Sequence, residues 1–270
     1  MSQYYKARKT WGLYDPTKKE PHRISRSKID LFLQCPRCFY LDQRLGISRP
    51  ASFPLTLNNA VDQLMKKEFD LHRAKGSKHP LVESYGIDAI PYDDSRMEEW
   101  RDALKRGIST VHAETNLFVR GGVDDVWVKP DGELIIVDYK ATSKDAEITL
   151  DDEWKIMYKR QMEIYQWLFK QNGFKVSNTG YFVYVNGKTD VEAFDGRLEF
   201  DVTILPYLGK TDWIPAVLRD LKKTLDLPLM PAPAEDCDYC AYRKESAKAA
   251  MAEKTPVVKK KKPGETASLL

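Results

Sequence analysis

Two aspartates and a lysine stand at the ends of neighbouring apolar runs, and their types and spacing predict chemistry. They are Asp124, Asp138 and Lys140. Two carboxylates suit Mg²⁺ or Mn²⁺, which prefer hard oxygen ligands, and such an ion activates water and stabilises the charge that develops during phosphodiester cleavage. The lysine would orient or deprotonate that water and offset the charge of the phosphate. The pattern therefore predicts an enzyme that hydrolyses phosphodiester bonds.

A β-hairpin is the element that must bring these three residues together. Val123–Val128 and Glu133–Lys140 are predicted strands, and Pro130-Asp131-Gly132 between them suits a tight turn. The register of this hairpin places Asp124 opposite Asp138, with the lysine on the same face two residues further on. Facing carboxylates repel each other unless a cation lies between them. The hairpin thus predicts a divalent-metal site at its open end.

Length and composition set the class of protein. The chain has 270 residues, of which 42% are hydrophobic, which is enough for one large domain or two small ones. Its formal net charge of +3 is only mildly basic, so charge alone does not identify a nucleic-acid partner. The sequence lacks the long apolar run of a membrane span and the apolar core of a secretory signal. We therefore expect a cytoplasmic protein without a membrane partner.

Hydrophobic periodicity predicts an α/β fold with a central mixed β-sheet flanked by α-helices. Leu57, Leu64, Met65 and Phe69 follow the helical spacing that buries one side of a helix. Besides the hairpin, the predicted strands are 117–120, 180–185 and 198–204, and the predicted helices are a short one around 29–33 and longer ones at 57–71, 96–106, 151–170 and 211–226.

The chain is expected to divide into three parts. Residues 1–23 are predicted to be an irregular basic arm, because they are polar, basic and aromatic. Residues 24–243 contain the periodic segments and the cysteines, and we expect them to form the folded domain. Residues 254–270 include the lysine run 259–262 and have no core pattern, so we expect a disordered basic tail.

The four cysteines form two Cys-x-x-Cys pairs near opposite ends of the domain. They are Cys35, Cys38, Cys237 and Cys240. In a cytoplasmic protein this spacing indicates metal binding rather than disulfides. Four thiolates suit either a tetrahedral Zn²⁺ ion or a [4Fe–4S] cluster, and the spacing leaves both open. Either centre would act as a clasp that joins the N-terminal and C-terminal segments.

Four segments together resemble the PD-(D/E)XK nuclease superfamily, in its RecB-like branch. Gly121–Asp124 resembles the Gly-x-Ile-Asp segment of that family, and Val137–Lys140 resembles its Asp/Glu-x-Lys strand. Gln161–Tyr165 resembles its Gln-x-x-x-Tyr helix motif, and Ser25–Leu41 resembles the N-terminal helix and cysteine of the branch. The resemblance implies a restriction-endonuclease-like fold and a nuclease that depends on a divalent metal ion.

The resemblance also implies roles for individual residues. Asp124 and Asp138 would bind the metal ion, together with the backbone carbonyl of Tyr139. Lys140 would be catalytic, and Gln161 and Tyr165 would contact DNA and order the active site. Where the branch usually has a metal-binding histidine on its second helix, this chain has Asp62. We expect Asp62 to be a third metal ligand, with a solvated position at the edge of the helix as an equal alternative.

The resemblance favours an iron–sulfur cluster over zinc at the cysteines. Members related to the CRISPR-adaptation exonuclease family use one N-terminal and three C-terminal cysteines for a [4Fe–4S] cluster. This chain has two cysteines at each end instead. Zinc therefore remains an alternative.

Basic and aromatic residues near the motifs predict contacts with DNA. Arg37, Tyr40, Lys159 and Arg160 combine attraction for phosphate with a surface for base stacking, which suits single-stranded DNA or DNA with free ends. We expect an exonuclease or endonuclease of DNA repair, recombination or CRISPR adaptation. The alternatives are an RNA-processing nuclease and a noncatalytic nucleic-acid-binding subunit with the same fold.

Overall fold

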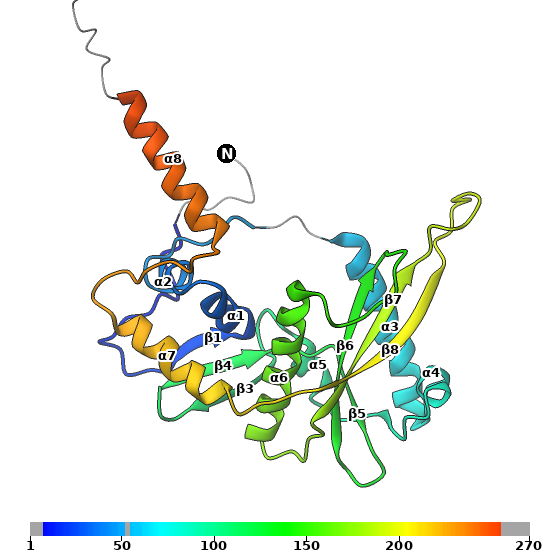
Figure 1. Ribbon diagram of the computed structural model, residues 1–270. Helices are drawn as coiled ribbons and strands as arrows, with labels where there is room; N and C mark the ends of the chain where they lie inside the picture. The colour runs from blue at the N-terminus through cyan, green and yellow to red at the C-terminus, as the bar shows by residue number, and fades with distance from the viewer. Residues whose placement is uncertain (1–7, 52–54, 255–270) are drawn as a thin grey trace, which may run out of the picture.

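A five-stranded mixed β-sheet forms the centre of the molecule (Figure 1). The computed structural model describes residues 8–51 and 55–254. In the strand order β2-β5-β6-β7-β8, β6 and β7 are parallel and the other neighbours are antiparallel. The bounds are Ile90–Pro91 (β2), Asp125–Val128 (β5), Leu134–Thr142 (β6), Thr179–Gly187 (β7) and Phe200–Leu208 (β8). A mixed sheet flanked by helices confirms the predicted α/β fold.

A second sheet has three strands in the order β1-β4-β3. Their bounds are His22–Ser25, Leu117–Gly121 and Ile108–His112, respectively. Only β4 corresponds to a predicted strand. β1 begins inside the segment 1–23, which was predicted to be irregular. The strand was not predicted because it is short and pairs in parallel with a strand far along the chain. Pairing of this kind satisfies the backbone hydrogen bonds of β1, but local sequence patterns do not predict it.

Two helices cover opposite faces of the five-stranded sheet with separate hydrophobic cores. α3 (Thr56–Lys75) lies on one face, where Phe69 packs in the same cluster as Ile135. α6 (Ile156–Gln171) lies on the other face, in the cluster that contains Ile136. Successive side chains of a strand point to opposite faces, so neighbouring residues of β6 enter different cores.

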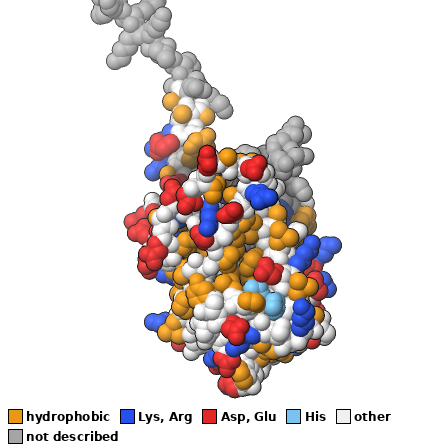
Figure 2. Space-filling view, turned by 90° about the vertical axis from the view of Figure 1, so that its right-hand side faces the viewer, with side chains coloured by type: hydrophobic (Ala, Val, Ile, Leu, Met, Phe, Trp, Pro, Cys, Tyr) orange, Lys and Arg blue, Asp and Glu red, His pale blue; other side chains and the backbone are white. Residues whose placement is uncertain are grey.

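Helix α3 turns two of its leucines away from the sheet. Leu57 and Leu64 are 60% and 63% exposed, whereas Met65 and Phe69 are buried, so the predicted apolar stripe is wrong in part. The side of α3 that faces the sheet has side chains at spacings of three and four residues: Asn58, Asp62, Met65, Lys66, Phe69 and Arg73. Figure 2 shows hydrophobic side chains in the middle of the right-hand face of Figure 1, with charged side chains around them.

The turn and the register of the predicted hairpin are confirmed. Val126 lies opposite Ile136 in the β5–β6 ladder. Gly132 has a φ of 80°, which suits glycine, and the Lys129 amide donates to the Glu133 carbonyl oxygen at 2.9 Å to close the turn. The alternation of apolar residues and the position of one glycine therefore predicted this element.

The open end of the hairpin is shorter than predicted. The β5–β6 ladder ends at the pair Asp125–Val137, and the Val123 amide instead donates to the carbonyl oxygen of Trp100 at 3.1 Å. Asp124 therefore precedes the strand and is not a member of it. Its side chain is not held to one face of the sheet, and it turns toward the edge of β6.

The remaining helices lie around the two sheets (Figure 1). They are α1 (Arg26–Gln34), α2 (Pro36–Arg44), α4 (Pro80–Ser84), α5 (Met97–Arg101), η1 (Glu153–Lys155), α7 (Ile214–Asp226) and α8 (Asp238–Lys254). The sequence analysis did not predict α8, which projects from the body and buries no continuous stripe (Figure 1). Residues 255–270, predicted to be a disordered tail, lie outside the described residues. Within the described chain, no helix is long and apolar enough to cross a membrane.

Candidate active site

A gap opens beside β6 at the point where β5 ends. Beyond Val137, β6 has a ladder partner on one side only, namely β7. Two side chains replace the missing strand: Oδ2 of Asp124 accepts from the Tyr139 amide at 3.1 Å, and Nδ2 of Asn58 donates to the Ala141 carbonyl oxygen at 2.7 Å. Backbone polar groups that are shielded from water need partners, so these contacts stabilise the open edge.

A cavity of about 520 Å³ occupies this gap. Its walls come from the start of α1, from α3, from β6 and from the start of α6. The polar side chains that line it include Arg26, Asn58, Asp62, Asp124, Lys140 and Gln161. The structure thus brings five predicted site residues, including Tyr139, together from four separate segments of the chain. Arg26 is an addition that the sequence analysis missed, although it lies at the start of a predicted helix.

Asp138 lies at the inner wall of the site and is fully buried. Its Oδ1 accepts a hydrogen bond from Nε2 of Gln161 at 2.6 Å, and its Oδ2 forms an ion pair with Nζ of Lys140. The same Gln161 amide lies 3.3 Å from the hydroxyl of Tyr165, which is one helical turn further along α6. Four of the predicted catalytic residues therefore form one connected group.

The pKa values of the two hairpin carboxylates, Asp124 and Asp138, are shifted in opposite directions. Burial raises the pKa of Asp138 to about 7, against the opposing effect of Lys140. Burial would also raise the pKa of Asp124, but the ammonium groups of Lys66 and Lys140 outweigh it and lower that pKa below its ordinary value. The negative charge of Asp124 adds to the effect of burial on Asp138 and raises its pKa further.

Glycine at position 121 permits the close approach of α6 to β4. A Cβ at this position would lie 2.5 Å from Cε1 of Tyr165, which is closer than real Cβ atoms come. Tyr165 is 3% exposed, and the surrounding core leaves little room for its ring to shift. Gly121 therefore acts through packing, because it lets the Tyr165 hydroxyl reach Gln161.

Lys66 is a charged residue of the site that the sequence analysis missed. Its Nζ lies 2.8 Å from Oδ2 of Asp62 and 3.1 Å from Oδ1 of Asp124, so one ammonium joins both carboxylates. Asp62 and Lys66 are four residues apart on α3 and share the side that faces the sheet. That spacing was the available signal. Asp62 therefore lies at the cavity with its side chain 33% exposed, and its role as a metal ligand stays a prediction.

Asp125 stabilises the backbone next to the site from the opposite face of the sheet, and it was not among the predicted site residues. It is fully buried and forms ion pairs with Arg73 and with Arg101, whose Nη2 lies 3.4 Å from Oδ1. Its Oδ2 accepts from the hydroxyl of Tyr139 at 2.6 Å. Nε of Arg101 also donates to the carbonyl oxygen of Asp124 at 3.1 Å. This network fixes the backbone that carries Asp124, while the Asp125 carboxylate itself points to the opposite face.

The oxygen atoms around the cavity fit a divalent cation in chemical type. They are the carboxylates of Asp62 and Asp124 and the carbonyl of Tyr139, which faces the gap because the N–H and C=O of one strand residue point to the same side. The carboxylate of Asp138 lies behind them, in contact with Gln161 and Lys140. Mg²⁺ and Mn²⁺ prefer such hard donors. In this structure the carboxylates are paired with lysine and glutamine side chains. A divalent ion would therefore compete with Lys66 for the same oxygen atoms.

Two of the residues predicted to contact DNA have structural contacts instead. Tyr40 is 4% exposed and its hydroxyl donates to the Leu227 carbonyl oxygen at 3.0 Å, so its ring is not available for base stacking, and this prediction is wrong. Nε of Arg37 donates to the Pro231 carbonyl oxygen at 2.8 Å and holds the C-terminal segment. Both residues lie on α2, which packs against α7 rather than against the cavity.

The other two predicted DNA contacts lie on the first turns of α6, next to Gln161. Nη1 of Arg160 lies 3.2 Å from Oδ1 of Asp30, so it joins α6 to α1. Lys159 is partly exposed beside it. Both residues stay near the cavity, and a contact with nucleic acid remains a prediction for them.

The structure brings the four cysteines into one buried cluster, as the paired spacing predicts. The cluster joins the segment around α1 and α2 to the segment before α8. Among the residues that the structure describes, these four form the only group of three or more cysteine, histidine or acidic residues whose ligand atoms all lie within 4.8 Å of one another. The arrangement is consistent with the predicted metal clasp.

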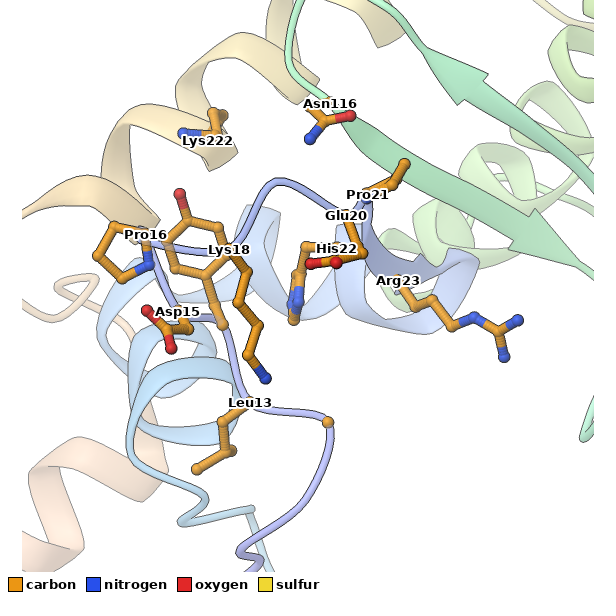
Figure 3. A pocket seen from close by; sticks show the side chains of 12 residues that line it. Leu13, Asp15, Pro16, Lys18, Glu20, Pro21, His22, Arg23, Asn116 and Lys222 are labelled. Atoms are coloured by element: carbon orange, nitrogen blue, oxygen red, sulfur yellow. The ribbon is translucent and has the colours of Figure 1, made fainter.

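A second cavity, of about 340 Å³, lies beside the N-terminal segment (Figure 3). Residues 12–23 line it together with Asn116 and Lys222. Two acidic residues, Asp15 and Glu20, line it, and Asp15 accepts a hydrogen bond from the hydroxyl of Thr17 at 2.7 Å, which is a local turn contact. Because its lining includes no predicted site residue, we place the candidate active site beside β6.

The mixed sheet and its edge site define an α/β protein suited to metal-assisted hydrolysis of phosphodiesters. The sequence matches the profile of the PD-(D/E)XK nuclease superfamily over residues 23–244. The match spans most of the chain, and the protein belongs to the PD-(D/E)XK nuclease superfamily. Membership supports a metal-dependent nuclease activity in general and implies a nucleic-acid substrate.

Comparison with individual proteins adds little to this assignment. No curated protein matches the chain. A solved structure, the crystal structure of SSO0001, is 17% identical over 84% of this chain and 86% of that chain, with a TM-score of 0.35. The family assignment therefore rests on the sequence profile.

Proposed function

We propose that this protein is a DNA nuclease of the RecB-like branch that uses Mg²⁺ or Mn²⁺ to hydrolyse phosphodiester bonds. The observation that carries the proposal is the connected group of Asp138, Lys140 and Gln161 at the edge of β6, with Asp124 across the gap. An ordinary hairpin does not place a buried carboxylate, an ammonium group and an amide around one cavity. Such a cluster is costly to bury, so its presence supports a chemical role.

Each residue has a defined part in the proposed reaction. Asp62, Asp124, Asp138 and the Tyr139 carbonyl would hold the divalent ion, which supplies an activated water and charge neutralisation when bound. Lys140 directs its ammonium group at the phosphate and its attacking water. Gln161 holds Asp138 in position through the 2.6 Å hydrogen bond.

Cationic side chains supply the attraction for the phosphate backbone. Arg26 and Lys140 both line the cavity, and Lys66 contacts two of its carboxylates. The cavity is open at the sheet edge and combines charged and amide side chains with apolar and aromatic ones, which suits a nucleic-acid strand threaded along it. We propose single-stranded DNA or DNA with free ends as the substrate. A role in DNA repair, recombination or CRISPR adaptation follows from the resemblance of the motifs.

The test of the proposed function is a cleavage assay with labelled single-stranded DNA, double-stranded DNA and RNA of one sequence. We expect cleavage of single-stranded DNA with Mg²⁺ or Mn²⁺, and loss of cleavage after treatment with EDTA that returns when the ion is added back. Preferred cleavage of RNA would overturn the DNA assignment. Binding without cleavage under every metal condition would favour the noncatalytic alternative.

Replacing Lys66 with methionine is expected to strengthen Mn²⁺ binding by at least about tenfold, because a competing cation is removed from between two carboxylates. Titration calorimetry without nucleic acid measures this directly, so the result does not depend on activity. Lys67→Met is the matched control, since its side chain lies on the exposed side of α3. Equal Mn²⁺ affinity in both variants and the parent chain would show that Asp62 and Asp124 do not bind the ion together.

A further inference from the structure

The sulfur atoms of the cysteine cluster have the spacing of a single tetrahedral ion. Sγ of Cys38 lies 3.6 Å from that of Cys237 and 3.7 Å from that of Cys240, and Sγ of Cys35 lies 3.8 Å from that of Cys240. Four thiolates at about 2.3 Å from one zinc ion are separated by about 3.8 Å, by the geometry of the tetrahedron. These three separations agree with this value, and all four sulfur atoms lie within 4.8 Å of one another.

The same separations disagree with the other centres that four cysteines form. A [4Fe–4S] cluster places a cube of iron and sulfide between the thiolates, so it holds their sulfur atoms much farther apart than one ion does. A disulfide has its sulfur atoms about 2.05 Å apart, and all four cysteines are free. Separations of 3.6–3.8 Å are those of S–H···S contacts between free thiols, and they are also those of four thiolates around one ion.

Two helices direct their N-termini at the cluster. Cys35 caps α2 and Cys38 lies in its first turn, while Cys237 precedes α8 and Cys240 lies in its first turn. The amide of Cys240 donates to the carbonyl oxygen of Cys237 at 3.0 Å, which begins the second helix there. The positive end of a helix dipole stabilises negative charge. The two helix ends therefore favour negative charge at both cysteine pairs, and they oppose burial, which raises the pKa of Cys38 and of Cys240.

Arg49 brings a full positive charge to the same cluster. Its Nη2 donates to Sγ of Cys237 at 3.6 Å, and its guanidinium group lies 4.5 Å from the ring centre of Tyr239. Nη1 donates to Oε1 of Gln34 at 2.6 Å, at the end of α1. A centre with four thiolates and one divalent ion carries a net charge of −2, and a neighbouring guanidinium offsets part of it. Such partners tune the affinity of a metal site.

We propose that the four cysteines bind one zinc ion with four thiolate ligands, in place of an iron–sulfur cluster, and that Arg49 is a positioning residue of this centre. All four coordination positions are then occupied by protein sulfur, which is the arrangement of structural rather than catalytic zinc. The ion joins the start of α2 to the start of α8 and so closes the two ends of the domain. This inference concerns a different metal from that of the cleavage site, and the two are tested separately.

The metal content of the full chain tests the zinc assignment. The protein would be purified without oxygen from cells supplied with both iron and zinc, and zinc, iron and acid-labile sulfide would be measured per chain. We expect one zinc per chain and a colourless protein. Brown protein with iron and sulfide in equal amounts would overturn the proposal, and so would a metal-free, folded chain. Replacement by Co²⁺ is expected to give the visible spectrum of a tetrahedral four-thiolate site.

Replacing Arg49 with glutamine tests the positioning role. We expect zinc to bind about 10- to 100-fold more weakly, as measured by competition with a chelating dye. Arg49→Lys keeps the charge and is expected to recover part of the affinity, whereas Arg243→Gln, an exposed position on α8, is the matched control. If Arg49→Gln and Arg243→Gln hold zinc equally well, Arg49 has no part in the centre.

Discussion

Replacing Lys140 with methionine is expected to lower the rate of phosphodiester cleavage by about 100- to 10,000-fold, the range in which a positioned proton-transfer group contributes. The ammonium group of Lys140 forms an ion pair with Asp138 and lines the cavity, so its loss removes the positive charge nearest the proposed reaction. Methionine keeps most of the side-chain volume, but it removes Nζ, which lies 4.6 Å from the ring centre of Tyr158. The measurement is the single-turnover rate on labelled single-stranded DNA with saturating Mn²⁺.

Lys144→Met is the matched control for this variant. Lys144 follows β6 and forms an ion pair with Asp152 at 3.0 Å, outside the cavity. Lys140→Met is expected to bind Mn²⁺ more tightly than the control, because it removes an ammonium group paired with the proposed ligand Asp138, so both rates are measured at saturating Mn²⁺ and below the unfolding temperature of each variant. A Lys140→Met protein that cleaves DNA at the rate of the control would sink the proposed catalytic role, whatever the metal dependence of the parent chain.

Replacing Cys237 and Cys240 together with serine is expected to release the C-terminal segment 228–254 while the sheets stay folded. Beyond Leu227, few contacts other than the cysteine cluster hold this segment, and almost every described residue of α8 after Cys240 is exposed. If the free energy that holds the segment closed falls by about 1.4 kcal/mol, the population of the locally open state rises tenfold. A structural zinc ion contributes more than this amount to the stability of the segments it joins. We therefore expect proteolytic cleavage within 228–240 to be at least tenfold faster.

Limited proteolysis followed by mass measurement of the fragments tests this expectation. Ala241→Ser is the control, because it introduces a serine at an exposed position in the same turn of α8. Removal of zinc from the parent chain should reproduce the cleavage pattern of the double variant. Cleavage spread evenly over the chain would show instead that the cluster stabilises the whole domain, and unchanged cleavage would show that it does not anchor this segment.

Local patterns in the sequence determined the central hairpin and the cysteine cluster. Alternating apolar residues set the register of Val126 opposite Ile136, and Gly132 allowed the turn. Both depend on neighbours a few residues away, which is why periodicity predicts them. The cysteine pairs were also readable, because a Cys-x-x-Cys spacing has few uses and two such pairs suit one centre.

The sequence also placed the proposed site residues near one another through the order of the family motifs, although it did not show how they contact. Asp124 was expected inside a strand opposite Asp138. The chain leaves the ladder earlier because Val123 bonds to Trp100. The carboxylate of Asp124 therefore reaches the Tyr139 amide and Lys66. A hydrogen bond to a distant segment decided this, and no local pattern encodes it.

Tertiary structure alone decided which charges compensate one another and which side chains are covered. Asp125 is buried because Arg73 and Arg101 arrive from two other helices. Tyr40 is covered because α7 packs on α2, and an aromatic side chain reads the same in a sequence whether it is covered or exposed. Burial and the choice of ionic partners depend on segments far apart in the chain. The sequence therefore predicted the residue types of the site, while long-range packing determined their partners.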